Sequence, residues 1–176
     1  SFPGDIDLLI IPFEADELVL SMALAIELKV VRATFKRQDK SPNQYGFSQA
    51  NALLNCGLPY VAVAHLIVSD DSPEENWEDA FITSVINTRR GTCSGPQQIK
   101  NDQMPAHLIG RSFGRLVANC PKKSIGLLAT YVSDNNLWFP QGKRALFNTK
   151  TSIRTMDAVA DYYYANATGF FETKRY

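Results

Sequence analysis

The chain has 176 residues, of which 45% are hydrophobic and 20% are charged. This ordinary globular mix is enough for one domain with a buried core, and it excludes collagen, long disordered tails and disulfide-dense scaffolds. The formal net charge is zero, yet residues 1–88 carry 5 basic and 13 acidic side chains, whereas residues 89–176 carry 13 and 5. Such segregation is a hint of polyanion binding, although the same charges would also let the two halves attract each other within the fold.

Two apolar strands joined by a polar tip are predicted first. Residues 6–13 are expected to form a buried strand, and residues 14–17 the tip. Residues 18–32 are expected to return beside the first strand as a longer one, because apolar and polar side chains alternate toward its end. A helix is the alternative for the start of this segment, since Leu, Met and Ala favour helix.

A helix and a parallel strand are predicted next. The polar and basic residues 34–45 indicate a loop, and residues 46–55 a helix that ends at Gly57. Residues 60–68 are strongly apolar and predict a third strand. A strand, a helix and a strand of these lengths imply a parallel crossover.

The second half is predicted to contribute three helices and two strands. Ser72, Pro73 and Glu75 are typical of a helix start with Ser72 as the cap, and residues 89–104 are predicted to be a loop. The remaining predicted elements are a helix over 105–119, a strand over 124–133, a short strand near 137–139 and a final helix over 155–167 capped by Thr155. The sum is an α/β or α+β domain with a mixed sheet flanked by helices.

Acidic residues and one lysine alternate along the first two predicted strands. Asp5 and Asp7 share one face of the first strand. Glu27 and Lys29 share one face of the second, because side chains two apart in a strand point the same way. A turn centred on the polar tip would place Asp5 opposite Glu27. The same register would put Asp7 opposite Ala25, so either aspartate could share a metal ion with Glu27.

The negative charges of this group need to be neutralised by a cation. Three carboxylates on adjacent apolar strands would repel each other and lose hydration, and Lys29 offsets only one of them. Hard oxygen ligands favour Mg²⁺, with Mn²⁺ as a substitute. A metal ion on Asp7 and Glu27, with Asp5 as a further ligand, would lower the pKa of a bound water and neutralise charge on a phosphate ester. Lys29 would stabilise the hydroxide or the pentavalent phosphorus.

This pattern resembles the PD-(D/E)xK nuclease superfamily, the proteins with a restriction-endonuclease-like fold. The resemblance rests on the run G-D-I-D-L-L-I, the 19 residues between Asp7 and Glu27, and E-L-K within an apolar strand that a helix and a parallel strand follow. It covers about residues 4–68. Two features depart from the family. Ile6 stands where the family has proline, and the usual first helix and strand do not precede the aspartates, so either they lie upstream in a longer protein or another segment takes their place.

The resemblance implies a magnesium-dependent deoxyribonuclease of the restriction or repair type. Asp7, Glu27 and Lys29 would be catalytic, and Gln49 from the helix, with Gln44 as the weaker choice, would face the active site. Residues 1–176 would then be one nuclease-like domain, with a catalytic core over 1–68 and an extension over 69–176. DNA is the expected partner, and a homodimer is compatible with cutting both strands.

Two other interpretations remain open at this point. In one, the same fold is a catalytically inactive module that binds DNA or a protein. In the other, the chain is an unrelated mixed-sheet domain in which the carboxylates serve only ion pairs. For the residues themselves, the alternative to a metal site is that Asp7 and Lys29 form a cross-strand ion pair and Glu27 is solvated at a sheet edge.

Two basic groups are candidates for phosphate contacts, which position DNA without reading its sequence. The first directly follows the E-L-K strand, and the second lies between Gln141 and Thr155, near the aromatic residue Phe147. Each group would otherwise be a solvated surface, and the aromatic side chain a core residue. The candidate DNA-binding residues are Arg32, Lys36, Arg37 and Lys40 in the first group and Lys143 and Arg144 in the second.

The thiols and imidazoles are predicted to be structural. Cys56, Cys93 and Cys120 are sparse, odd in number and without metal-type spacing, which fits a reducing compartment. His65 and His107 have no partner at zinc spacing. A secretory signal sequence and an apolar run long enough to span a bilayer are not recognisable. We therefore expect a cytoplasmic protein without a membrane segment.

Overall fold

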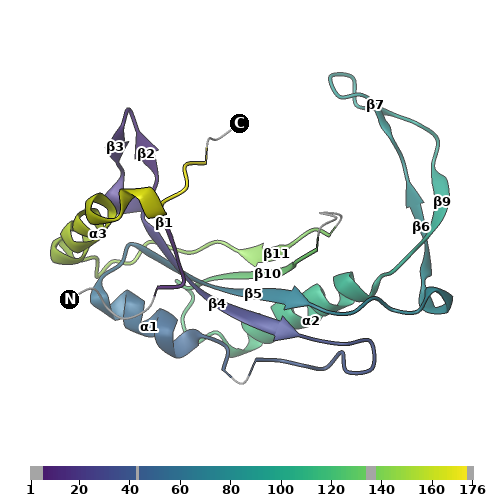
Figure 1. The fold of residues 1–176 in the computed structure, drawn as a ribbon, viewed down its shortest axis with the longest axis horizontal. Coiled ribbons are helices and arrows are strands. Elements are labelled where there is room, and N and C mark those ends of the chain that lie inside the picture. Colours follow the sequence, from purple (N-terminus) through teal and green to yellow (C-terminus); the bar gives the residue numbers. More distant parts are fainter. Residues whose placement is uncertain (1–5, 43, 134–137, 174–176) are drawn as a thin grey trace.

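A five-stranded mixed sheet forms the centre of the computed structural model, which describes residues 6–42, 44–133 and 138–173 (Figure 1). The strand order is β1–β4–β5–β10–β11. The three inner strands are parallel, and each outer strand runs antiparallel to its neighbour. The strands are β1 (Leu8–Ile10), β4 (Leu24–Arg32), β5 (Tyr60–Val68), β10 (Gly126–Tyr131) and β11 (Gln141–Lys143). The prediction of a mixed sheet with helices is confirmed.

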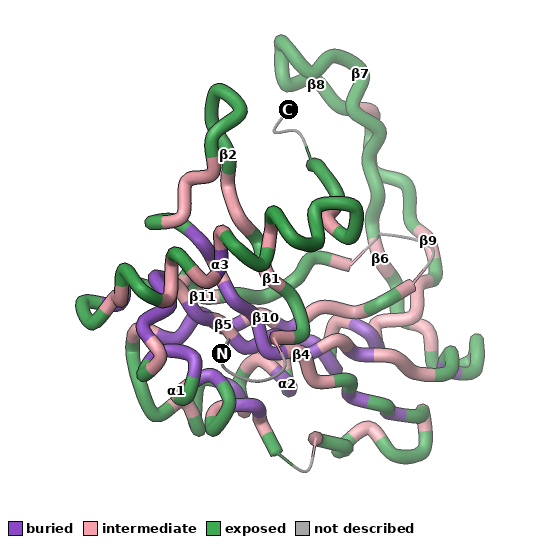
Figure 2. Tube along the Cα trace, turned by 60° about the vertical axis from the view of Figure 1, so that its left-hand side comes forward, coloured by how far each residue is buried: buried purple, intermediate pink, exposed green. Residues whose placement is uncertain are grey.

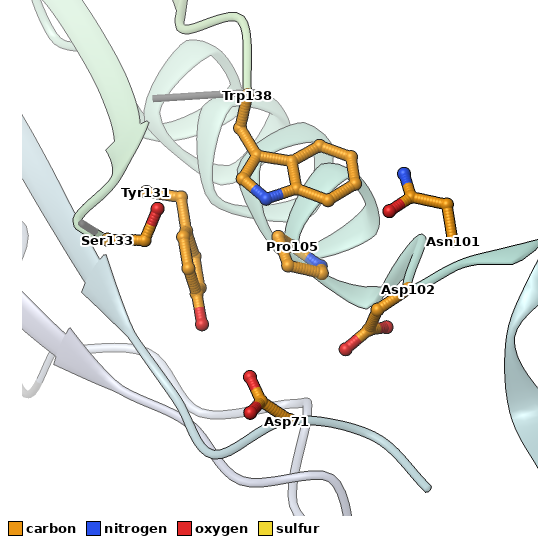
Figure 3. A pocket seen from close by; sticks show the side chains of 7 residues that line it. All are labelled: Asp71, Asn101, Asp102, Pro105, Tyr131, Ser133 and Trp138. Carbon is orange, nitrogen blue, oxygen red and sulfur yellow. The ribbon is translucent and has the colours of Figure 1, made fainter. Parts of the chain in front are cut away.

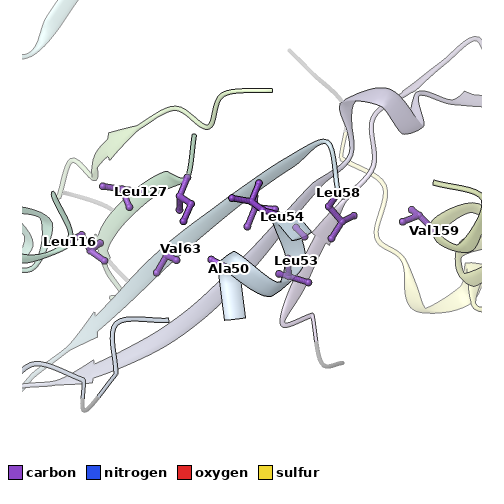
Figure 4. Packing of buried hydrophobic residues seen from close by; sticks show 11 residues of the cluster. Ala50, Leu53, Leu54, Leu58, Val63, Leu116, Leu127 and Val159 are labelled. Atoms are coloured by element: carbon purple, nitrogen blue, oxygen red, sulfur yellow. The ribbon is translucent and has the colours of Figure 1, made fainter. Parts of the chain in front are cut away.

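Two helices cover one face of the sheet. α1 (Phe47–Cys56) joins β4 to β5, and α2 (Met104–Asn119) lies between β5 and β10 in the chain. Both contribute to one buried cluster with the three inner strands, in which Leu54 of α1 and Leu116 of α2 are buried (Figure 4). The predicted helix before Gly57, the strand after it and their parallel crossover are confirmed.

The third helix extends the same cluster beyond the sheet. α3 (Ile153–Ala165) is followed by the short turn η3 (Ala167–Gly169) and contributes the buried Val159 (Figure 4). Its cap was predicted to be Thr155, and this is wrong. Ser152 is the cap, because its Oγ accepts a hydrogen bond of 3.4 Å from the Thr155 amide, while the Thr155 hydroxyl donates to the carbonyl oxygen of Cys56.

The segment between β1 and β4 is more broken than predicted. β2 (Phe13–Glu14) and β3 (Glu17–Leu18) form a small hairpin whose two turn residues, Ala15 and Asp16, both have positive φ. A single turn of 3₁₀ helix, η1 (Leu20–Met22), then precedes β4. The predicted strands over 6–13 and 18–32 are therefore interrupted. Neither continuous strand nor longer helix describes the start of the second segment.

An extended arm replaces the helix predicted after Ser72. The arm is defined as residues 78–101, and it projects from the sheet (Figures 1 and 2). After the short turn η2 (Glu74–Asn76), β6 pairs with β9 and β7 pairs with β8, all antiparallel. The bounds are β6 (Glu78–Ile82), β7 (Val85–Asn87), β8 (Thr92–Cys93) and β9 (Gln97–Asn101). The loop predicted over 89–104 is thus wrong in the part that forms β8 and β9.

The helical prediction failed because its evidence was local. Trp77, Phe81 and Val85 have helical spacing, but the β-branched residues around them favour a strand, and pairing with β9 decides the outcome. Ser72 does not cap a helix. Its hydroxyl donates to Asp102 Oδ1 at 2.5 Å instead.

The last strand also lies elsewhere than predicted. Of the short strand expected near 137–139, Trp138 and Phe139 belong to no strand, and Leu137 lies outside the described residues. β11 forms a few residues later, where Gly142 pairs with Leu128 of β10. The helix over 105–119 and the strand over 124–133 are confirmed within one or two residues at each end.

Candidate carboxylate site between β1 and β4

The pairing of β1 with β4 brings Asp7, just before β1, beside Glu27 of β4. Leu8 pairs with Ile26 and Leu9 with Ala25. Asp7, directly before β1, therefore lies at the level of Glu27. The predicted register, with Asp7 opposite Ala25, is wrong by two residues, because the hairpin and η1 shift the returning segment. Asp5 lies outside the described residues.

Asp7 is exposed, and its carboxylate faces β4. Its Oδ2 accepts a hydrogen bond of 2.8 Å from the backbone amide of Leu28. This contact fixes the aspartate against the strand that carries Glu27 and Lys29. The side chain is thus oriented by the backbone of β4, whichever ion or solvent it meets on its outer side.

Glu27 is a buried carboxylate with a charged partner. Its side chain is 2% exposed, and its Oε1 lies 2.7 Å from Nζ of Lys29, which is 24% exposed. Removing a carboxylate from water is costly unless a countercharge accompanies it, so Lys29 is what allows a charged Glu27 at this depth. The interpretation in which Asp7 pairs with Lys29 and Glu27 is solvated is therefore wrong.

Helix α1 begins against this ion pair. A Cβ on Gly46, the residue before α1, would lie 2.9 Å from Cγ of Glu27 and 3.5 Å from Cε of Lys29. Gly46 also has a φ of 87°, which is unfavourable for other residues. Glycine thus lets the amino-terminal end of α1, the positive end of its dipole, approach the carboxylate of Glu27.

His65 continues the polar row on the neighbouring strand, where it pairs in register with Lys29. Its Nδ1 is 2.8 Å from Oγ of Ser112, its Nε2 is 3.5 Å from the carbonyl oxygen of Tyr45, and its ring stacks on the Tyr45 ring at 6.1 Å. Because a carbonyl only accepts, Nε2 carries the proton and Nδ1 accepts from Ser112. The prediction of a structural histidine is confirmed.

Burial lowers the pKa of His65 below its ordinary value. Desolvation is the largest cause, the Tyr45 carbonyl opposes it, and the positive charge of Lys29 adds to it. The imidazole is therefore neutral near pH 7. It contributes hydrogen bonds to the interior and no charge.

The polar row separates two hydrophobic clusters. One cluster includes Ala25 and Val63, and the other includes Val31 and Ile67 further along the same strands. Between them, on the face covered by α1 and α2, lie the polar side chains of Glu27, Lys29, His65 and Ser112. Burying a row of polar groups at this position costs free energy of folding, and a functional role would explain why the row is present.

The expected glutamines are on the surface. Gln49 is exposed in the first turn of α1, and Gln44 is exposed in the preceding loop. The first turn of α1 is next to Gly46, so Gln49 comes from the helix end that approaches the carboxylates. No hydrogen bond of either glutamine side chain appears among the described contacts.

The first basic group is exposed; Arg32 ends β4, and the other three residues lie on the following loop, which α2 holds in place. The guanidinium of Arg111 donates to the carbonyl oxygen of Gln38 at 2.5 Å, and that of Arg115 donates to those of Asp39 and Lys40 at 2.9 and 3.0 Å. These two arginines were not predicted, because only the fold brings α2 to the loop. The exposed side chains of the first group are those of Arg32, Lys36, Arg37 and Lys40.

The second basic group lies at the opposite edge of the sheet. Lys143 ends β11, which is separated from β1 by three strands, and Arg144 follows it. The Lys143 ammonium donates to the carbonyl oxygen of Lys123 at 3.2 Å. The structure therefore does not bring Lys143 and Arg144 together with the carboxylates. Phe147, the aromatic residue of this group, is 50% exposed, and its ring lies edge-on to that of Tyr60 at 5.8 Å.

A cavity of about 170 Å³ lies apart from the carboxylates, where β5 and β10 end (Figure 3). In it, Tyr131 shares a hydrogen bond of 3.0 Å with Oγ of Ser69. Burial alone would raise the pKa of Asp102, but hydrogen bonds from Ser72 and Met104 outweigh it, so the pKa is lowered. The lining residues are Asp71, Asn101, Asp102, Pro105, Tyr131, Ser133 and Trp138.

The described side chains offer fewer metal ligands than a fully coordinated metal ion needs. Within residues 6–42, 44–133 and 138–173, no group of three or more His, Cys, Asp or Glu side chains is placed to hold a metal ion together. Asp7 and Glu27 are the two carboxylates at one level of neighbouring strands. A metal ion there would need water or substrate oxygens as its other ligands, as Mg²⁺ commonly has.

Comparisons with protein-family models, curated proteins and solved structures found no significant match to this chain. Among the described residues, no helix is both long and apolar enough to cross a bilayer.

Proposed function

We propose that this protein is a metal-dependent phosphodiesterase that cleaves DNA, with a restriction-endonuclease-like arrangement of β1, β4, α1 and β5. One observation carries the proposal. Glu27 is buried and ion-paired with Lys29 two residues further along β4, and Asp7 lies at the same level on the adjacent strand. Two neighbouring carboxylates can hold a divalent cation that activates water and neutralises phosphate charge, and a lysine beside them can stabilise the charge that develops.

The residues present fit a hard divalent cation. Asp7 and Glu27 offer carboxylate oxygens, and each carboxylate is already oriented, one by the Leu28 amide and the other by Lys29. They would hold Mg²⁺ or Mn²⁺, with Asp5 proposed as a further ligand outside the described residues. When bound, such an ion would polarise the phosphate and lower the pKa of a coordinated water.

Lys29 has two roles in this proposal. Without substrate it neutralises Glu27. Its partly exposed ammonium sits on a flexible stem, so it can leave the carboxylate when a cation takes its place and turn toward the phosphate. There it would stabilise the negative charge that develops on the phosphate oxygens during attack. Gln49, from the first turn of α1, would help to orient the attacking water.

DNA is the proposed substrate because of the exposed positive charge beside the site. Arg32 ends β4, and the other three basic residues of the first group lie on the loop that follows, whose backbone Arg111 and Arg115 contact at residues 38–40. A fixed basic loop can contact successive backbone phosphates without reading the bases. Lys143 and Arg144, at the far edge of the sheet, would contact DNA only beyond the cleavage point.

A second candidate function is a catalytically inactive module with the same fold that binds DNA or a protein. The observation in its favour is the Lys29–Glu27 ion pair itself, because it occupies one oxygen of a carboxylate that is almost inaccessible. In this case the pair would be a permanent structural contact, and the basic loop would retain its role in binding.

Cleavage of plasmid and oligonucleotide DNA in Mg²⁺ or Mn²⁺ tests the proposal. The informative variant is Asp7→Asn, because Asp7 is exposed and the amide oxygen can still accept from Leu28. We expect it, like Glu27→Gln, to reduce the cleavage rate by roughly 100-fold or more. The matched control is Glu14→Gln, which alters an exposed acid on β2 and should leave the rate unchanged.

Two outcomes would overturn the proposal. Equal rates for the wild type, Asp7→Asn and Glu27→Gln would remove catalysis from this site. Absence of cleavage by the wild type with either cation, together with DNA binding that Lys36→Ala and Arg37→Ala weaken, would favour the inactive module. Circular dichroism of each variant excludes loss of the fold as the cause.

A further inference from the structure

The arm has no partner within the described chain. Its strands pair only with each other, and every residue from 81 to 93 is exposed. Figures 1 and 2 show it reaching away from the sheet and the helices. A two-stranded ribbon alone in water is marginally stable, and its two edges leave backbone groups free to pair. Within the described residues, the arm is therefore stabilised only by the pairing of its own strands.

Apolar side chains occur on both faces of the arm. Phe81, Ile82, Val85 and Ile86 are between 48% and 70% exposed. Neighbouring residues of a strand point to opposite faces, so Phe81 and Ile82 cannot both be covered by a flat surface on one side. A partner that packs against one face therefore covers one of these two side chains and leaves the other exposed.

The base of the arm is firmly connected to the body. Asp102, just after β9, accepts hydrogen bonds from the amide of Ser72 at 2.9 Å and from the amide of Met104 at 2.9 Å. The indole of Trp77 donates to the carbonyl oxygen of Ser72 at 3.0 Å. Both strands of the arm therefore leave the body from one hydrogen-bonded clamp, which holds the arm in a defined direction.

The accessible surface is larger than that of a compact chain of this mass. It measures 12098 Å², whereas a compact monomer of 19.6 kDa would expose about 8,600 Å². The excess is roughly 3,500 Å² per chain. If a second copy covered about half of it, the two chains together would bury the area that is usual for permanent homodimers.

The charges of the arm are opposite at its two ends. Arg89 and Arg90 are exposed at the tip, whereas Glu74 and Glu75 are exposed beside its base. Within the arm, Lys100 is already paired with Asp79 at 2.8 Å. If two arms pair antiparallel about a two-fold axis, the basic tip of each meets the acidic base of the other. The same arrangement covers the apolar residues on the face of the ribbon that meets the other arm.

We propose that the partner of the arm is a second copy of this chain, and that the two arms pair antiparallel to form a homodimer. The tip arginines of each copy contact Glu74 and Glu75 of the other. The inference uses no part of the carboxylate site, so its success or failure is independent of the proposed nuclease activity.

Sedimentation equilibrium of the full chain tests whether the exposed apolar side chains of the arm contribute to the dimer. We expect a dimer for the wild type, and a dissociation constant at least about tenfold higher for Phe81→Ser/Ile86→Ser. These side chains are exposed, so the monomer should fold normally. The matched control is Ile153→Ser, which removes an equally exposed apolar side chain from α3 and should leave the dimer unchanged.

Reversing the charges at the tip or at the base tests whether the tip of each arm contacts the base of the other. Arg89→Glu/Arg90→Glu should be monomeric, because an acidic tip would meet an acidic base. Glu74→Lys/Glu75→Lys should be monomeric for the converse reason. A mixture of the two variants should form a heterodimer, since each tip then meets a base of opposite charge. Tip-to-tip pairing also predicts that the mixture associates, but only pairing of tip with base predicts in addition that the wild type dimerises while each variant alone does not.

Three results would overturn the proposal. They are a wild type that remains monomeric at the highest soluble concentration, a dimer that the arm variants do not weaken, and a mixture that fails to associate. If the wild type is monomeric and Arg89→Glu/Arg90→Glu loses affinity for DNA, the arm binds nucleic acid and not a second copy.

Discussion

The buried polar row shows what single residues can and cannot reveal before the fold is known. The grouping of Asp7, Glu27 and Lys29 could be predicted because strand alternation alone puts the last two on one face. The other residues that contact this group could not be predicted. Gly46 and His65 reach the row through the loop before α1 and through the register of β5, and neither contact leaves a signal in the sequence.

The neutral state of His65 predicts how stability depends on pH. Because burial lowers its pKa, the unfolded state takes up a proton near pH 6.5 that the folded state does not. This contribution to stability is complete above pH 6.5 and decreases as the pH falls below it. We expect the free energy of unfolding to fall by up to about 1.4 kcal/mol per pH unit in that range.

Urea unfolding between pH 7.5 and pH 5 measures this effect. His65→Gln should remove the slope, whereas His107→Gln, which alters an exposed histidine, should retain it. The lowered pKa values of Asp79 and Asp102 act near pH 4 and below, outside this range. A slope that survives in His65→Gln would show that another group titrates there.

At the scale of elements, strong local sequence patterns predicted the helices and strands correctly, whereas weak patterns did not. The apolar run of β5 and the helix ending at Gly57 follow from short-range preferences that the tertiary structure does not oppose. The first half of the arm was predicted as a helix because its apolar spacing fits both periods, and the second half as a loop. Strand β6 depends on pairing with β9, which follows it only after the β7–β8 hairpin and lies outside a short local window.

The start of α1 makes a prediction about glycine. Gly46→Ala should destabilise the protein by about 2–4 kcal/mol, because a positive φ and the close approach to Glu27 both oppose a Cβ. Gly91→Ala is the matched control. Gly91 also has a positive φ, but no atom lies within 4 Å of its added Cβ, so the cost should be about 1 kcal/mol. Equal costs in urea unfolding would show that contact with Glu27 is unimportant.

At the scale of the whole molecule, the body and the arm have different sources of stability. Helices α1 and α2 pack on one face of the sheet and build both clusters, to which no arm residue contributes. Composition and length predicted a domain with a buried core, but they could not reveal that a long segment lies outside it. That division depends on which segments pair with the central strands.

The body should therefore fold without the arm. Replacing residues 79–100 by a short Gly-Ser turn joins Glu78 to Asn101, which are paired in register. At low protein concentration we expect the free energy of unfolding to change by less than about 1 kcal/mol. Leu116→Ala, in the buried cluster, should cost about 2–5 kcal/mol. An unfolded product after arm replacement would mean that the arm is part of the core.

The position of β1 has a consequence for control of the site. Glu27 and Lys29 belong to a nine-residue strand with neighbours on both sides, whereas Asp7 adjoins a strand of three residues at the margin of the described sheet. Short marginal strands detach at a small fraction of the cost of global unfolding. Asp7 can thus move away while Glu27 and Lys29 stay in place. Any ligand or protein that binds the outer edge of β1 would therefore determine whether the three residues come together.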